Sequence, residues 1–318
     1  MKKTILVTGG NGFIGKKLTD ALLQAGYKVK VVSRRAPTKQ PANPDISVVQ
    51  ADYQNVDSLI NAMKGCSGVF HLAAAIFGFK FEDFERANTI ATQNMVKAAN
   101  QTEGLERFVY VSSLAASGYA DSADHPRTEA DIPNPCSDYG ITKLGGEKAV
   151  KTLKESISWT IVRPPIVYGR NDSGVSKIAS WVRRGLMVNT SGKGLFSFVY
   201  VEDLVKALVM LTHLQGTNKE TFFISEETTY LWPVFIEKMA SAMGVRKPFM
   251  PNAPLWLLKL AASIYSLTAR LSGAQPALNY DKVKEAVIDG HWICSSQKWR
   301  QLSKQEFTSL DEGLKKSF

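Results

Sequence analysis

The stretch Gly9-Gly10-Asn11-Gly12-Phe13-Ile14-Gly15 decides how the rest of the chain is interpreted. An apolar run, Thr4-Ile5-Leu6-Val7, precedes it, and an amphipathic segment, Lys16 to Ala25, follows it. This order predicts a strand, a glycine turn and a helix. Residues without a Cβ let such a turn close and let a pyrophosphate approach the backbone, while the helix N-terminus offers free N–H groups to the phosphates. The stretch therefore predicts a dinucleotide site; a tight turn that binds nothing is the alternative.

The composition is that of a folded protein with one large or two small domains. The chain has 318 residues, of which 44% are hydrophobic, which is enough to bury a core. Its cysteines, Cys66, Cys136 and Cys294, lie far apart and show neither a disulfide framework nor zinc spacing. We therefore expect a reducing compartment, the cytoplasm, and no metal. We also expect no signal peptide, because Met1-Lys2-Lys3 leads straight into the first strand.

The net charge of +10 calls for an explanation. The lysines and arginines are spread along the chain, whereas a nucleic-acid binder more often concentrates them on one face with aromatic residues between them. We therefore expect no nucleic-acid partner. A basic surface of this kind suits an anionic ligand, such as a phosphorylated cofactor or an acidic membrane face. A solvated basic surface without a partner is the alternative.

Short apolar runs alternate with longer amphipathic segments over the first half of the chain. Strands are predicted at 27–32, 46–51, 69–72, 107–111 and 157–162, and helices at 56–63, 82–100 and 137–155. This alternation predicts an α/β fold with a Rossmann-type doubly wound parallel sheet, covered by helices on both faces. We expect a dinucleotide-binding domain over 1–165, to which 196–228 return, and a smaller, mainly helical substrate-binding domain over 166–318.

One apolar segment, Ala253 to Leu271, stands apart from this pattern. Lys259 and Arg270 interrupt it, so its unbroken apolar length falls short of the roughly 20 residues that a membrane span needs. The segment is interpreted as a helix packed over a substrate cavity or under the second domain. Peripheral contact with a membrane surface is the alternative.

Tyr139 and Lys143 are four residues apart near the start of a predicted helix, which places both side chains on one face. A phenol has a pKa near 10, and an ammonium one turn away helps it to act as an acid or base at neutral pH. Ser112 and Ser113 end the preceding strand, at the sheet edge where ligands bind. We expect Ser113 to hydrogen-bond a substrate oxygen and Ser112 to bond nearby backbone. A surface Tyr–Lys pair is the alternative interpretation.

The tip of the second strand bears on the choice between NAD and NADP. A carboxylate at this place would bind the adenosine 2′-hydroxyl and repel a 2′-phosphate. The chain has Ser33, Arg34 and Arg35 instead. Because a guanidinium forks onto phosphate, we expect Ser33 and Arg34 to bind NADP(H), with NAD(H) as the less favoured cofactor. An exposed basic turn is the alternative.

Eight short motifs follow one another along the chain. They are Thr8 to Gly15, Ala51-Asp52-Tyr53, Val69 to Ala74, Asn88 with Asn94, Val111-Ser112-Ser113, Tyr139 with Lys143, Arg163 to Gly169, and Tyr200 to Leu204. With these motifs the chain resembles the extended short-chain dehydrogenase/reductase family, within the NAD(P)-dependent epimerase/dehydratase superfamily, along almost all its length. The Leu-rich segment near 255 and Leu278 to Val283 are most similar to the dihydroflavonol-reductase and 3β-hydroxysteroid-dehydrogenase branch.

The resemblance implies a role for individual residues. Ser113 would orient the substrate oxygen, Tyr139 would be the general acid or base, and Lys143 would be its partner and would hold the cofactor ribose. The implied cofactor-binding residues of the glycine turn are Gly9, Gly12, Phe13, Ile14 and Gly15. Asp52 and Tyr53 would lie at the adenine, Leu72, Ala73 and Ala74 beneath the cofactor, and Pro164 beside the nicotinamide. His71 is interpreted as structural. Helices 82–100 and 137–155 resemble the pair that forms the family's dimer, so a homodimer is expected.

The expected activity is NADP(H)-dependent interconversion of a ketone and a secondary alcohol on an apolar or aromatic small molecule. The loop Ile76-Phe77-Gly78-Phe79 is aromatic rather than polar, which favours this substrate class. Two alternatives stay open: a nucleotide-sugar epimerase or dehydratase that retains NAD, and a non-catalytic NADP(H)-binding protein that senses redox state or acts as a scaffold.

Overall fold

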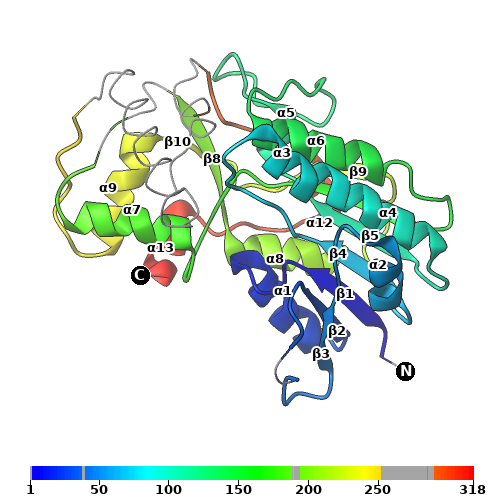
Figure 1. Ribbon diagram of the computed structural model, residues 1–318. Helices are drawn as coiled ribbons and strands as arrows, with labels where there is room; N and C mark the ends of the chain where they lie inside the picture. The colour runs from blue at the N-terminus through cyan, green and yellow to red at the C-terminus, as the bar shows by residue number, and fades with distance from the viewer. Residues whose placement is uncertain (1, 38–39, 188, 190–193, 252–284, 286–289) are drawn as a thin grey trace.

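A seven-stranded parallel sheet forms the centre of the molecule (Figure 1). The computed structural model describes residues 2–37, 40–187, 189, 194–251, 285 and 290–318. The strands of the sheet are β1 (Thr4–Thr8), β2 (Lys28–Ser33), β3 (Ile46–Gln50), β4 (Gly68–His71), β5 (Arg107–Val111), β6 (Ser158–Arg163) and β9 (Glu220–Phe223). Their order is β3-β2-β1-β4-β5-β6-β9, and every neighbouring pair is parallel. The predicted α/β, Rossmann-type doubly wound sheet is confirmed.

Helices cover both faces of this sheet (Figure 1). One face carries α1 (Phe13–Gln24) and α8 (Val201–Met210), and the other carries α2 (Val56–Met63), α4 (Ala91–Gln101) and α6 (Asp138–Val150). Alternate strand residues serve the two faces, since side chains of a strand point to opposite sides. In β1, Ile5 and Val7 join the core under α1 and α8, whereas Leu6 joins the core on the other face. Two apolar layers therefore hold the sheet.

The chain reverses its direction of winding between β1 and β4, which are neighbours in the sheet. From β1 it proceeds outward to β2 and β3, and it then returns to place β4 on the other side of β1. The carboxyl ends of the two strands lie level, with Thr8 paired to His71. In doubly wound folds this switch point forms the crevice where ligands bind. The fold therefore places the glycine turn, which follows β1, at a ligand-binding edge.

The helix predicted at 82–100 is divided into three parts. These are α3 (Phe81–Phe84), a π-helical segment η1 (Glu85–Ile90) and α4. The residues that directly follow β5 and Ser113 form a further short helix, α5 (Leu114–Ser117). Single π turns inside helices are rare and often mark functional sites, and a sequence period of 3.6 residues does not reveal them.

A smaller, three-stranded sheet begins the second part of the molecule. It has the order β10-β8-β7 and consists of β7 (Ile166–Tyr168), β8 (Leu195–Tyr200) and β10 (Thr229–Leu231). The helices of this part are α7 (Ser173–Arg183), α9 (Trp232–Ala242) and α13 (Leu310–Ser317), which gather at one end of the molecule in Figure 1, while α12 (Gln297–Ser303) lies beside β9. The apolar segment Ala253 to Leu271 lies outside the described residues. In the ranges that the structure describes, no helix is long and apolar enough to cross a membrane.

Candidate active site

The glycine turn leaves the beginning of α1 without a side-chain cap. Gly12 is the N-cap residue, no side chain of the described chain bonds to the helix end there, and the first turn has no acidic residue. The turn is closed by a hydrogen bond from Gly12 N to Gly9 O at 2.9 Å. The first N–H groups of a helix have no partner within the helix, and the helix dipole favours an anion beside them. This end of α1, at Phe13 and Ile14, therefore suits a phosphate group.

The glycines of the turn are required at different points. A Cβ on Gly15 would lie 2.1 Å from Gly9 O, so this position has room only for hydrogen. Gly9 has φ of +69°, which disfavours other residues, and a Cβ there would lie 2.9 Å from Ala73 N. A Cβ on Gly12 would meet Gly9 O at 3.1 Å and no other atom of the described chain within 4 Å. The space beyond Gly12 is thus open to a pyrophosphate, and the turn fits a dinucleotide.

Thr8 joins the end of β1 to the segment that follows β4. Its Oγ1 accepts hydrogen bonds from Leu72 N and Ala73 N, both at 3.0 Å. Leu72 and Ala73 are half-buried and Ala74 is exposed. The three residues therefore lie beside the glycine turn, where the family resemblance places them beneath the cofactor.

His71 is buried and hydrogen-bonded on both sides of its ring. Thr92 Oγ1 donates its own proton to Asn88 O at 2.6 Å, so it accepts a hydrogen bond from His71 Nε2 at 3.0 Å. Nδ1 then carries no proton and lies 2.7 Å from Thr8 Oγ1. Burial, with the nearby charge of Lys143, lowers the pKa of His71 to about 3. These contacts support the interpretation of His71 as a neutral structural residue.

The helix α6 positions Tyr139 and Lys143 at the same edge of the sheet. Its N-cap residue, Ser137, accepts a hydrogen bond from Gly140 N at 3.0 Å. Tyr139 is half-buried in the first turn, and Lys143 is 1% exposed one turn later. Lys143 Nζ donates to Val111 O at 2.8 Å and lies 4.1 Å from the centroid of the Tyr110 ring. Burial lowers the pKa of Lys143 to about 7.

Of the two serines after β5, Ser112 has a different partner from the one expected. The prediction that Ser112 bonds nearby backbone is wrong, because its Oγ donates to Glu147 Oε1 at 2.6 Å. Ser113 is the residue that bonds nearby backbone: its Oγ accepts from Ala115 N at 3.1 Å and caps α5. An acceptor role leaves the hydroxyl proton of Ser113 for another oxygen. Ser113 is half-buried and directly follows the strand end to which Lys143 bonds.

The residues expected at the adenine and the ribose lie at the ends of β2 and β3. Arg34 is exposed, and Ser33 Oγ forms bonds within its own turn, to Arg35 N and Arg35 O. Burial raises the pKa of Tyr53 to about 12, partly offset by a hydrogen bond with Thr8 and by the charge of Arg34. The phenol therefore lies near both the glycine turn and Arg34. Asp52 is exposed and accepts a hydrogen bond from Gln54 N at 2.9 Å.

Pro164 closes the site on the other side of Ser113. It is buried and directly follows β6, and its carbonyl oxygen accepts a hydrogen bond from Leu114 N at 2.9 Å. The ends of β5 and β6 are thereby held together. The structure thus brings the glycine turn, Ser113, Lys143 and Pro164 to one edge of the sheet.

Asn88 is a residue of this site to which the sequence assigned no role. It lies buried in the π-helical segment η1, and its Oδ1 accepts from Ala75 N at 2.8 Å. Its Nδ2 donates to Ala75 O at 3.0 Å and to Thr142 Oγ1 at 3.1 Å. Asn88 therefore joins the segment after Ala74 to the helical turn between Tyr139 and Lys143. Its presence among the family motifs was the only signal in the sequence.

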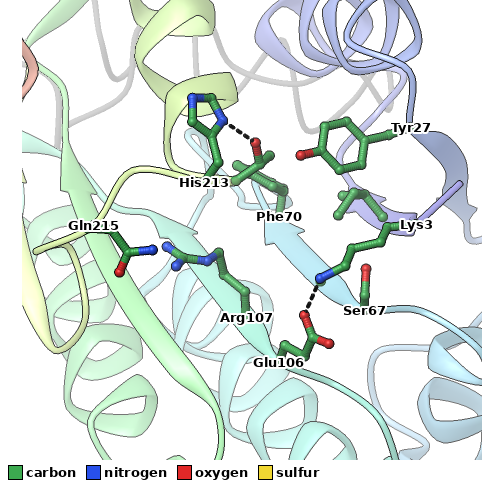
Figure 2. Close-up of a pocket in the computed structure, with 11 residues that line it drawn as sticks. Lys3, Tyr27, Ser67, Phe70, Glu106, Arg107, His213 and Gln215 are labelled. Carbon is green, nitrogen blue, oxygen red and sulfur yellow. Dashed lines mark hydrogen bonds and ion pairs between the residues drawn. The ribbon is translucent and has the colours of Figure 1, made fainter.

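A pocket of about 230 Å³ lies at the opposite edge of the sheet (Figure 2). Lys3, Tyr27, Arg107 and His213 are among its lining residues, and Lys3 Nζ forms an ion pair with Glu106 at 2.6 Å. This edge carries the amino ends of β1, β4 and β5. None of the residues expected to bind cofactor or substrate lines this pocket.

Comparison with known proteins agrees with this geometry. The model of the NAD dependent epimerase/dehydratase family matches residues 5–225. An uncharacterized protein of Sinorhizobium fredii is 35% identical over 84% of this chain and 67% of its own length. Ceramide reductase of Caulobacter vibrioides is 26% identical over 96% of this chain and 91% of its own length. The structure of MoeE5 in complex with UDP-glucuronic acid and NAD is 25% identical, with a TM-score of 0.76 over 98% of this chain and 96% of that one.

Proposed function

Because this chain belongs to the NAD-dependent epimerase/dehydratase family and is an NAD(P)-dependent enzyme of the extended short-chain type, we propose that it is an NADP(H)-dependent reductase or dehydrogenase. Its substrate is an apolar or aromatic small molecule that alternates between ketone and secondary alcohol. The observation that carries this proposal is the bond from Lys143 Nζ to the end of β5, the strand that continues into Ser113, from a helix that carries Tyr139 one turn earlier.

Each of the three residues has a separate task in this reaction. When bound, the nicotinamide supplies or accepts the hydride. The Tyr139 phenol passes a proton to the substrate oxygen in reduction and removes it in oxidation. The ammonium of Lys143 stabilises the phenolate that forms in reduction, and it binds the ribose hydroxyls. Ser113 donates a hydrogen bond to the substrate oxygen, using the proton that its capping bond leaves over.

The preference for NADP(H) rests on Arg34. Its side chain is exposed at the end of β2, and its chain neighbours Ser33 and Arg35 carry no carboxylate that would hold a 2′-hydroxyl. A guanidinium binds phosphate through two parallel hydrogen bonds. The 2′-phosphate of NADP(H) is therefore the group that Arg34 suits.

The preference for an apolar substrate rests on the loop after Ala74. Ile76 and Phe79 are exposed there, although large apolar side chains are usually buried. The loop is fixed to the site through the bonds of Asn88 to Ala75. The similarity to a ceramide reductase points in the same direction, because its name states reduction of a lipid.

A nucleotide-sugar epimerase is the second candidate, and the similarity to MoeE5 with UDP-glucuronic acid and NAD favours it. Such an enzyme returns the hydride to its own substrate and keeps its cofactor. Purified protein that releases a stoichiometric amount of NAD on denaturation would support the epimerase.

The proposal is tested by incubating the apo-protein with NADPH or NADH and a panel of hydrophobic and aromatic ketones. We expect NADPH to be consumed in a 1:1 ratio with alcohol formed for at least one ketone. Interconversion of UDP-sugars without net cofactor consumption, and no reduction of any ketone, would contradict the reductase and establish the alternative.

We also propose that the chain has two domains and forms a homodimer. Helices α4 and α6, which resemble the family's dimer pair, lie side by side on one face of the sheet (Figure 1). Light scattering of the purified protein should give twice the mass of the chain, and a monomer mass would refute the dimer.

A further inference from the structure

We propose that Glu147 is a positioning residue of the active site, which holds the ends of β5 and β6 against α6 and supplies the carboxylate that supports the Lys143 ammonium. Glu147 follows Lys143 by one helical turn, so Tyr139, Lys143 and Glu147 share one face of α6. The inference rests on the proposed function, because it concerns the residues to which that function assigns the proton transfer.

Buried side chains donate three hydrogen bonds to the carboxylate of Glu147. Its Oε1 accepts from Ser112 Oγ at 2.6 Å and from Arg163 Nε at 2.9 Å, and its Oε2 accepts from Arg163 Nη2 at 2.7 Å. The Glu147 side chain is 1% exposed and the Arg163 side chain 4%. A bidentate pair of this kind fixes both side chains in direction as well as in distance.

The two partners of Glu147 are the chain neighbours of residues that the proposed reaction needs. Ser112 precedes Ser113, and Arg163 precedes Pro164. Val111, which precedes Ser112, provides the oxygen to which Lys143 Nζ bonds. One carboxylate therefore sets the position of both strand ends relative to α6, and with them the proposed oxygen-binding serine and the proposed wall of the nicotinamide pocket.

The same carboxylate is the negative charge next to Lys143. The titratable groups near the amine also include His71 from β4, which is neutral, Tyr110 from β5, whose ring lies under Nζ, and Tyr139, one turn earlier on α6. The charge of Glu147 raises the pKa of Lys143 against the larger effect of burial. Arg163, on β6, offsets part of that charge, so the ammonium form of Lys143 is only partly stabilised.

If the Glu147 charge supports the Lys143 ammonium, removal of the ion pair must change the pH at which Lys143 titrates. Buried pairs can often be replaced by uncharged residues without loss of stability, whereas removal of one partner leaves a costly buried charge. The double variant Glu147→Gln/Arg163→Met removes both charges together and is the informative change. Thr160→Val is the matched control, because Thr160 is also buried on β6 and donates to Thr217 O at 2.7 Å.

The experiment follows the titration of Lys143 without any cofactor. The free energy of unfolding is measured against pH in three backgrounds: the wild type, the double variant and Thr160→Val. In each background the protein with Lys143 is compared with the protein that also carries Lys143→Met, and the difference is the contribution of Lys143. The pH at which the Lys143 contribution appears should fall by about one unit or more in the double variant, since it loses an opposite charge nearby. It should not move in Thr160→Val. An unchanged midpoint in the double variant would overturn the inference.

Ser112→Ala provides a second test that keeps both charges, for use if the double variant does not fold. It removes one bond of Glu147 next to Ser113 and should lower kcat about tenfold, while melting stays within a few degrees of the original. An unchanged kcat would overturn the positioning role. If Tyr139→Phe also kept full turnover, the proposed function would fail instead. The cofactor-free titration would still report on Glu147.

Discussion

Lys143 Nζ donates a hydrogen bond of 2.8 Å to the backbone oxygen of Val111, the last residue of β5. This bond brings the amine of a helix to the strand end that continues into Ser112 and Ser113. The same amine lies over the Tyr110 ring and is almost completely buried. A buried ammonium with few hydrogen-bond acceptors costs free energy. Hydroxyl groups of a bound cofactor or substrate would therefore stabilise the Lys143 ammonium.

Lys143→Met should make the cofactor-free protein more stable at neutral and acidic pH. Burial lowers the pKa of Lys143 from 10.5 to about 7. Between these two values the unfolded chain binds the proton and the folded chain does not, so wild-type stability rises with pH across this window. The advantage of the variant should be greatest below pH 7 and should shrink toward pH 10.5. Urea unfolding at several pH values measures it.

Lys148→Met is the matched control, because Lys148 is exposed on the same helix. It should leave the pH dependence of unfolding as it is in the wild type. A constant difference between wild type and Lys143→Met at all pH values would show that Lys143 does not titrate in this range.

Arg34→Ala should weaken NADPH binding and leave NADH binding unchanged. A hydrogen bond to a charged group contributes about 1.5–3 kcal/mol, so the dissociation constant of NADPH should rise about 10- to 100-fold. Arg35→Ala is the control, because Arg35 is the exposed neighbour whose backbone, not its side chain, bonds to Ser33. Fluorescence titration with both cofactors decides. Equal losses for NADPH and NADH would remove the case for a 2′-phosphate contact.

Gly12→Ala should impair cofactor binding without unfolding the protein. The added methyl group requires Gly9 O, 3.1 Å away, to shift by only a few tenths of an ångström, but it stands where a pyrophosphate would approach α1. We expect the dissociation constant of NADPH to rise at least about tenfold, with little change in melting temperature. Gly174→Ala, in the first turn of α7, is the control. Unaltered NADPH affinity in Gly12→Ala would place the phosphates elsewhere.

The fold was predictable because local patterns carry it. Thr4 to Val7, the glycine turn and the amphipathic helix that follows it are read from neighbouring residues, and the structure has β1, the turn and α1 at these positions. The π-helical segment η1 could not be foreseen from local sequence. Its Asn88 bonds to Ala75 in the loop after β4 and to Thr142 on α6, and both partners are distant in sequence. The short strands β7 and β10 were missed because three residues are too few for a period.

The candidate site was predictable from sequence where its residues are close together in the chain. The spacing of Tyr139 and Lys143 predicts that they share a helix face, and the structure has both on α6, with the Lys143 amine at the end of β5. The bond to nearby backbone was expected at Ser112 and lies at Ser113, because both serines look alike in sequence and only the fold brings Glu147 to Ser112. Glu147 itself was overlooked, since its partner Arg163 meets it only through the pairing of β5 with β6.

The central claim is that the phenol of Tyr139 transfers the proton between enzyme and substrate. The most direct measurement is kcat of Tyr139→Phe with a ketone that the wild-type enzyme reduces, alongside the NADPH dissociation constant of the same preparation. The variant keeps the ring and loses the hydroxyl, so kcat should fall by about 10²- to 10⁴-fold with NADPH affinity unchanged. A Tyr139→Phe enzyme that reduces the ketone at the wild-type rate would contradict the account.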